Sequence, residues 1–282
     1  MIRGLQINIK GRLYTFDKPK VMGILNLTPD SFFDGGSYIG NADAIRKRID
    51  SMIADGVDII DLGGCSTRPG AELPTADEEW HRLSEGFEIL NKYYPESIVS
   101  VDTFRASVAR LSVEQGGADI INDISGGDMD TDMFSTIAQL HVPYILMHMK
   151  GVPQNMQNNP EYTNVTDEVI KYLSQKVLEL RKQGVADIII DPGFGFGKTV
   201  EHNYQLLRQL SRFEVFNMPI LAAISRKSMI YKVLGTDAQH SLNGTTALNM
   251  IALCNGAHLI RVHDVREAKE CIALAEVLNG NV

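Results

Sequence analysis

The chain has 282 residues, 44% hydrophobic and 22% charged, a composition typical of a soluble globular protein with a sizeable core. Its net charge of −8 excludes a basic field that would attract nucleic acid or an anionic membrane, so an anionic ligand must be held by local cations. We find no signal-peptide pattern, no apolar run near the roughly 20 residues of a membrane span, and no metal-like cysteine spacing. We therefore expect a cytoplasmic protein with one domain over residues 1–282.

In chain order, a possible hairpin at 5–16 comes first, and eight short apolar segments with strand character follow. These candidate strands are 21–25, 57–62, 98–101, 118–121, 143–147, 188–190, 220–222 and 257–261. Helical patterns fill the gaps, most clearly at 42–55, 162–183, 242–255 and 265–278. Eight alternations of strand and helix predict an α/β protein of the (β/α)₈ TIM-barrel class, and the alternative is a doubly wound parallel sheet.

Polar residues follow the candidate strands closely. In a (β/α)₈ barrel the active site lies at the carboxyl ends of the strands, so these side chains should converge on one end of the barrel. They are Asn26, the run 63–68, Asp102, Asn122, Asp123, His148, Asp191, the run 225–227, Arg261 and His263.

Three of these groups suit the edge of a flat heterocycle. Asp102, Asn122 and Asp191 would point into one apolar pocket, where carboxylates accept hydrogen bonds and an amide both donates and accepts. Taken alone, Asp102 has a plainer interpretation as a helix cap. Asn26 is a neutral oxygen ligand suited to Mg²⁺, which takes few protein ligands, but it too can cap a turn.

The cationic groups suit anions. Arg261 and His263 are separated by one residue, so their side chains point the same way if the last strand extends to His263. They would then form a clamp for a diphosphate. Lys227 and Ser228 open a helix, where Lys227 can reach a ring atom and Ser228 a carboxylate. The glycine-rich runs 63–71 and 191–199 lack the spacing of a phosphate-binding P-loop.

Taken together, the runs GILNLTPDSFFDGG, GG-STRPGA, SVDTFR, INDISGG, LMHM, DPGFGFGKT, SRKSM and LIRVHDV, which span residues 23–265, resemble the dihydropteroate synthase family. That resemblance implies an enzyme of folate biosynthesis that condenses (7,8-dihydropterin-6-yl)methyl diphosphate with 4-aminobenzoate and releases diphosphate. It also implies small-molecule substrates, a Mg²⁺ cofactor and a homodimer.

The resemblance also assigns residues to each ligand. Pterin binding falls to Asp102, Asn122, Met147, Asp191, Phe196 and Lys227. The 4-aminobenzoate pocket uses Phe33, Thr67, Arg68, Pro69 and Ser228. Diphosphate binding falls to Asn26, Arg68, Arg261 and His263, with Mg²⁺ at Asn26, and the catalytic set is Asp102, Lys227, Arg261 and His263.

Two positions depart from the family pattern. Cys65 stands where the family usually has Glu, which puts the anchoring of the adjacent loop in doubt, and Ala223 stands where it usually has Gly. Two rival hypotheses stay open. One is a pterin-binding module of a cobalamin-dependent methyltransferase, which should lack STRPG, SRKS and the Arg-x-His pair. The other is a pterin-binding protein without activity. Diphosphate release with and without 4-aminobenzoate separates them.

Overall fold

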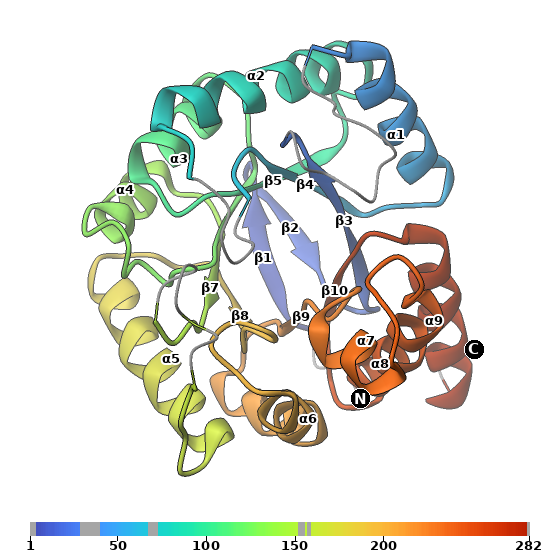
Figure 1. The fold of residues 1–282 in the computed structure, drawn as a ribbon. Coiled ribbons are helices and arrows are strands. Elements are labelled where there is room, and N and C mark those ends of the chain that lie inside the picture. Colours follow the sequence, from blue (N-terminus) through green and yellow to red (C-terminus); the bar gives the residue numbers. More distant parts are fainter. Residues whose placement is uncertain (1–3, 29–39, 67–72, 152–155, 157–158, 281–282) are drawn as a thin grey trace.

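Strands and helices alternate around a ring in the computed structural model, which describes residues 4–28, 40–66, 73–151, 156 and 159–280 (Figure 1). The parallel strands are β3 (Lys20–Asn26), β4 (Ile59–Gly63), β5 (Ile98–Asp102), β6 (Ile120–Asp123), β7 (Tyr144–Met147), β8 (Ile188–Asp191), β9 (Leu221–Ala222) and β10 (Leu259–Val262). Their order is β8-β7-β6-β5-β4-β3-β10-β9, and a bridge between Ile190 and Ile220 brings the two edges together. The predicted barrel is confirmed, and the doubly wound alternative is excluded.

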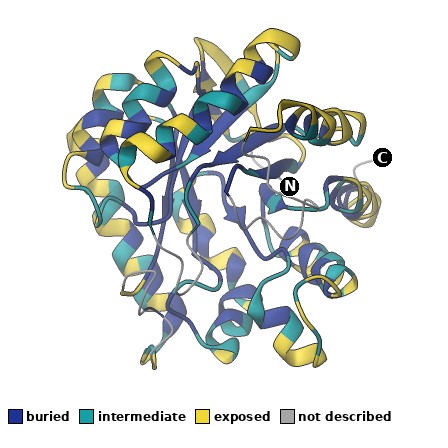
Figure 2. Ribbon diagram, turned by 45° about the horizontal axis from the view of Figure 1, so that its top comes forward, coloured by how far each residue is buried: buried dark blue, intermediate teal, exposed yellow. Residues whose placement is uncertain are grey.

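Helices cover the outside of the ring. They are α1 (Ala42–Ala54), α2 (Ala76–Tyr93), α3 (Ala106–Glu114), α4 (Met133–Leu140), α5 (Val165–Lys182), α6 (Val200–Arg208), the 3₁₀ helix Leu210–Phe216, α7 (Ser228–Leu234), α8 (Leu242–Cys254) and α9 (Val265–Leu278). Each amphipathic helix buries one stripe; in α1 the stripe is Ile45, Ile49 and Met52, spaced to fall on one face. Figure 2 shows these buried stripes turned toward the strands. Among the helices described, none is long and apolar enough to cross a bilayer.

The predicted hairpin is confirmed, and it closes one end of the barrel. Strands β1 (Gln6–Ile9) and β2 (Arg12–Thr15) pair antiparallel and lie across the middle of the ring in Figure 1. Ile7, Ile9 and Phe16 are buried in one cluster with apolar side chains from the parallel strands. Lys10 forms a 2.8 Å ion pair with Asp119, which immediately precedes β6, so the hairpin covers the amino ends of the strands.

Three strands begin about two residues later than the apolar pattern predicted. The reason is the same at β4, β6 and β10: the residue before the strand is polar and accepts a backbone N–H from a neighbouring strand or the segment leading into it. Asp58 Oδ2 accepts from Val21 at 2.7 Å, Asp119 Oδ2 from Val99 at 2.9 Å, and His258 Nδ1 from Ile220 at 3.2 Å. Each side chain thus accepts the N–H of the neighbouring segment, while the backbone N–H groups of Asp58, Asp119 and His258 donate to the carbonyls of Val21, Val99 and Ile220.

Two helix starts bear on the site. The pattern predicted a helix from 162, but α5 begins at Val165 because the Asn164 side chain caps it, accepting the N–H groups of Thr166 and Asp167. Tyr162 instead donates its hydroxyl hydrogen to the carbonyl of Gly197 at 2.8 Å. The start of α7 at Ser228 confirms the helix predicted after the seventh strand of the barrel.

Candidate active site

A polar layer lies above an apolar layer inside the barrel. The apolar layer includes Met22, Ile59, Ile120, Ile145, Ile189, Leu221 and Leu259, all buried in one cluster with the hairpin. Along each strand, the side chain two residues further on points to the same side. The next layer, toward the carboxyl ends of the strands, therefore contains Ile24, Asp61, Asn122, Met147, Asp191, Ala223 and Arg261. Ala223 keeps its methyl group buried at 5% exposure. The hairpin and apolar layer thus form the floor of a polar site.

Asp61 is the centre of a hydrogen-bond network within this layer. Its Oδ2 accepts from Arg261 Nε at 2.6 Å and from Asn122 Nδ2 at 3.2 Å. Arg261 Nη2 also donates to Asp102 Oδ2 at 2.8 Å. The structure therefore brings together three predicted site residues from β5, β6 and β10 and adds Asp61 of β4, which sequence reasoning missed.

Asp102 and Arg261 affect each other's charge. Burial, opposed by the positive charge of Arg261 and assisted by the negative charge of Asp61, raises the pKa of Asp102 to about 7. Burial alone would lower the pKa of Arg261, but the two carboxylates outweigh it and raise that pKa. The guanidinium is therefore a fixed cation, whereas Asp102 changes charge near neutral pH.

Asp191 and Lys227 form a second part of the site. Burial raises the pKa of Asp191 and lowers that of Lys227 to about 8, while the attraction between their charges opposes both shifts. Lys227 Nζ donates to the Phe194 carbonyl at 2.6 Å and lies 4.8 Å from the centroid of the Phe196 ring. Phe196 packs against the apolar cluster that contains Met147. The predicted pterin residues thus provide both an apolar wall and polar groups.

The backbone of the run GFGFGKT packs closely against neighbouring residues, which leaves room only for glycine. Gly193 has a φ of +73°, and a Cβ there would lie 1.9 Å from the carbonyl oxygen of His148. Lys198 is buried and donates to the carbonyls of Gly193 and Phe196 at 2.8 and 2.9 Å, and its Nζ lies 2.9 Å from His148 Nδ1. Burial lowers the pKa of His148 to about 2, so its ring is neutral. Lys198 therefore ties the loop down, another role that sequence reasoning missed.

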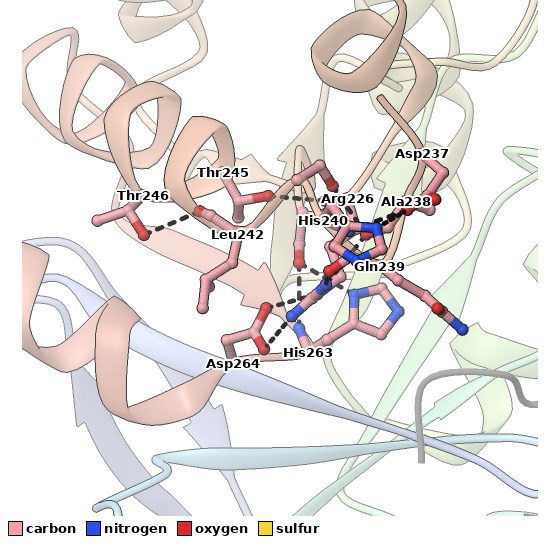
Figure 3. A network of polar contacts seen from close by, with 12 residues as sticks. Arg226, Asp237, Ala238, Gln239, His240, Leu242, Thr245, Thr246, His263 and Asp264 are labelled. Carbon is pink, nitrogen blue, oxygen red and sulfur yellow. Dashed lines mark hydrogen bonds and ion pairs between the residues drawn. The ribbon is translucent and has the colours of Figure 1, made fainter. Parts of the chain in front are cut away.

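Arg226 turns away from the site, contrary to the expected convergence of the run 225–227. Its Nε and Nη2 donate to both oxygens of Asp264 at 2.8 Å, and Nη1 donates to the carbonyls of Ala238 and Gln239 (Figure 3). Its backbone lies in the left-handed region, with a φ of +55°. His263 lies just beyond β10, with Nδ1 3.0 Å from Ser225 Oγ.

Asn26 and Gly63 end neighbouring strands. A Cβ at Gly63 would lie 2.9 Å from Asn26 Oδ1, so glycine leaves the room that the amide oxygen occupies. A neutral amide oxygen at a strand end suits Mg²⁺, which takes few ligands from a protein. Among the residues described, no group of three or more His, Cys, Asp or Glu side chains could hold a metal by itself.

Cys65 lies half-buried next to a buried ion pair. Burial and the charge of Glu79 raise the pKa of its thiol to about 12, so it is protonated. Glu79 pairs with Arg105, which also donates to the Pro74 carbonyl at 2.5 Å, and Arg82 donates to the Gly64 carbonyl at 3.0 Å. Two arginines therefore fasten both ends of the segment between Gly64 and Pro74.

Four predicted 4-aminobenzoate residues, Phe33, Thr67, Arg68 and Pro69, lie outside the described residues. Ser228 is the first residue of α7, as predicted. A cleft of about 420 Å³ lies elsewhere, at the amino ends of β4 and β5, and contains none of the predicted residues. The candidate site is at the opposite end, where the buried titratable groups with shifted pKa values gather.

Comparison with known proteins identifies the family. The pterin binding enzyme family matches residues 22–263. The dihydropteroate synthase of Escherichia coli is 41% identical over 274 residues, 96% of each chain. The Yersinia pestis dihydropteroate synthase, solved with a sulfonamide drug, superposes with a TM-score of 0.92 at 37% identity, covering 99% of this chain and 100% of that one. The Xanthomonas albilineans enzyme, solved with 4-aminobenzoic acid, has a TM-score of 0.88 at 34% identity, covering 98% and 99%. The chain therefore belongs to the pterin-binding enzyme family and, within it, to the dihydropteroate synthases.

Proposed function

We propose that this chain condenses (7,8-dihydropterin-6-yl)methyl diphosphate with 4-aminobenzoate, giving 7,8-dihydropteroate and diphosphate. The observation that carries this proposal is the Asp61–Arg261–Asp102–Asn122 network above an apolar floor. It combines groups that pair with a pterin edge and a cation that pairs with a diphosphate at one end of the barrel.

In this proposal the pterin is bound by its polar edge and its flat faces. Asp102 and Asp191 accept hydrogen bonds from ring N–H and amino groups, and Asn122 both donates and accepts. Lys227 reaches a ring oxygen or nitrogen. Met147 and Phe196 line the slot, which their membership of one apolar cluster supports.

The diphosphate is assigned to Arg261, His263, Asn26 and Arg68. The geometry of Arg261 supports this role. Asp61 and Asp102 accept hydrogen bonds from its Nε and Nη2, and no partner for Nη1 is found among the described residues, so Nη1 can donate to a diphosphate oxygen. Mg²⁺ bound at Asn26 would neutralise charge on the diphosphate oxygens. The Asn26 side chain supports that role, because it ends β3 and carries a neutral oxygen of the kind that Mg²⁺ takes from proteins.

The reaction breaks the bond between the pterin methylene carbon and a diphosphate oxygen and forms a carbon–nitrogen bond. Arg261 and His263 stabilise the negative charge that grows on the leaving diphosphate. Asp102 and Asp191 lie near the pterin ring as it becomes positive. The amine of 4-aminobenzoate is neutral at pH 7 and attacks with its lone pair. The new C–N bond makes the nitrogen positive and acidic, so it loses its proton to water or to the released diphosphate, and no strong general base is required. Phe33, Thr67, Arg68 and Pro69 would enclose 4-aminobenzoate, with Ser228 meeting its carboxylate.

Asp191→Ala tests the pterin assignment. A methyl group accepts no hydrogen bond, so this variant should lose pterin binding by calorimetry and form no dihydropteroate by mass spectrometry. The matched control is Asp43→Ala, an exposed position in the first turn of α1, which should behave as the unmodified protein. Unchanged pterin affinity in Asp191→Ala would remove Asp191 from the site.

We also propose that the protein works as a homodimer in the cytoplasm. Support for the dimer comes from exposed apolar side chains on three neighbouring helices, α7, α8 and α9: Val233, Leu234, Ile251, Leu274, Val277 and Leu278. Support for the cytoplasm comes from the three cysteines, which are all free, as expected in a reducing compartment. Sedimentation should give about twice the chain mass of 31.2 kDa, and the mass of a monomer would contradict the dimer.

A further inference from the structure

Asp61 is a fully buried carboxylate at the centre of the site's hydrogen-bond network, and the assignments above give it no ligand. It lies in the middle of β4 with 0% exposure. A single oxygen, Oδ2, accepts from Arg261 Nε on β10 and from Asn122 Nδ2 on β6. Its other oxygen, Oδ1, has no hydrogen-bond partner among the described residues.

This inference rests on the proposed function. There, the two side chains that donate to Asp61 Oδ2 bind different parts of one substrate. Arg261 is assigned to the diphosphate, and Asn122 is assigned to the pterin. Because they share one acceptor, the carboxylate fixes the distance and orientation of the two groups relative to each other. Strand pairing alone does not do this, since β6 and β10 are not neighbours in the barrel.

Each contact also fixes an orientation that matters for binding. The guanidinium plane of Arg261 is held at two nitrogens, by Asp61 at Nε and by Asp102 at Nη2. The amide of Asn122 has its Nδ2 directed at Asp61, which leaves Oδ1 to accept a hydrogen bond from a ligand. Reversing that amide would place two oxygen acceptors against each other, so the charge of Asp61 selects one orientation.

We propose that Asp61 is a positioning residue that joins diphosphate recognition to pterin recognition by holding Arg261 and Asn122 through one carboxylate oxygen. Replacing it with Asn removes the charge and the preference for one amide orientation while keeping nearly the same shape. Both recognition elements should then weaken together, even though they contact different parts of the substrate.

The experiment measures two ligands separately by calorimetry: inorganic diphosphate with Mg²⁺, and a pterin that carries a hydroxymethyl group in place of the diphosphate. Asp61→Asn should weaken binding of each by about tenfold or more, because a charge-assisted hydrogen bond is lost on each side. Ser100→Ala is the matched control, since Ser100 is the in-register neighbour of Asp61 on β5, is fully buried and has an unpaired Oγ. This control should bind both ligands as the unmodified protein does. An Asp61→Asn variant that folds cooperatively and keeps its affinity for either ligand would overturn the proposal.

A second variant tests the link even where Asp61→Asn does not fold. Asn122→Ala should weaken the binding of free diphosphate several-fold, although Asn122 is a pterin residue, because it removes a donor from the oxygen that orients Arg261. Asp191→Ala is the comparison, a pterin residue without a hydrogen bond to Asp61, and it should not weaken diphosphate binding. Equal diphosphate affinity in Asn122→Ala and the unmodified protein would contradict the link. Failure of the unmodified protein to bind either ligand would instead contradict the proposed function.

Discussion

Asp102 ends β5, where burial raises the pKa of its carboxyl group to about 7. The charges of Asp61, Glu79 and Asp123 act in the same direction, and the cation of Arg261 acts against them. The group is therefore mostly neutral below pH 7 and mostly charged above it. In the proposed function it must be charged to accept hydrogen bonds from a pterin.

The pterin affinity should consequently depend on pH. Well below pH 7 a proton must leave Asp102 before the pterin binds, so the affinity should fall by up to about tenfold for each pH unit. It should stop rising between pH 7 and 8, where Asp102 is ionised and Lys227, with a pKa of about 8, begins to lose its proton. Calorimetry with the hydroxymethyl pterin between pH 5.5 and 8 measures this. Asp102→Asn should bind more weakly and with a flatter pH profile. A flat profile in the unmodified protein would show that Asp102 does not bind the pterin as a carboxylate.

The sequence predicted the positions of Asp102, Asn122 and Arg261 well, because each comes at the carboxyl end of an apolar run. Asp61 was missed because it lies inside such a run, IIDLG. Its side chain points into the barrel because it comes two residues after Ile59, which faces the barrel interior, and the sequence gives no other sign of this direction. Lys198 was missed for a different reason. Its contacts are to backbone carbonyls whose positions depend on how two loops pack, and no residue pattern records them.

At the scale of elements, Arg226 connects three loops. It lies between β9 and α7, pairs with Asp264 before α9, and donates to Ala238 and Gln239 between α7 and α8 (Figure 3). Its neighbour Lys227 is a predicted site residue. The clamp therefore sets the position of a site segment without taking part in the site.

Arg226→Lys should lower the free energy of unfolding by about 1–3 kcal/mol, because an ammonium group cannot reproduce two parallel hydrogen bonds to a carboxylate and two more to carbonyls. Urea denaturation measures the loss. The control is Arg266→Lys, which changes an exposed arginine of α9 that pairs with Glu270 one turn away, and it should alter stability by less than about 0.5 kcal/mol. Equal small effects of both substitutions would show that the clamp does not stabilise the rim.

The types of the predicted elements were confirmed, but some of their boundaries were wrong. Hydrophobic periodicity records which residues face a core, so it found the strands and the long helices. It does not record side chains that accept a backbone N–H. Asp58, Asp119 and His258 do so before three strands, and Asn164 does so before α5. Each boundary therefore shifted by two or three residues.

For the whole molecule, the count of eight alternations predicted the barrel, since an apolar strand followed by an amphipathic helix recurs along the chain. The hairpin was also predicted, but not its place. Its position depends on Ile7, Ile9 and Phe16 burying their side chains against residues of the barrel strands far along the chain. Local sequence does not contain that contact, which closes the end opposite the active site.

In the proposed function, this barrel joins a pterin to 4-aminobenzoate with loss of diphosphate. The most direct measurement is the release of diphosphate from the pterin diphosphate, with and without 4-aminobenzoate, alongside the amount of dihydropteroate formed. We predict that diphosphate and dihydropteroate appear in equal amounts and that release depends on 4-aminobenzoate. Pterin binding without any release would indicate a pterin-binding protein without activity, and release that is independent of 4-aminobenzoate would also contradict the claim.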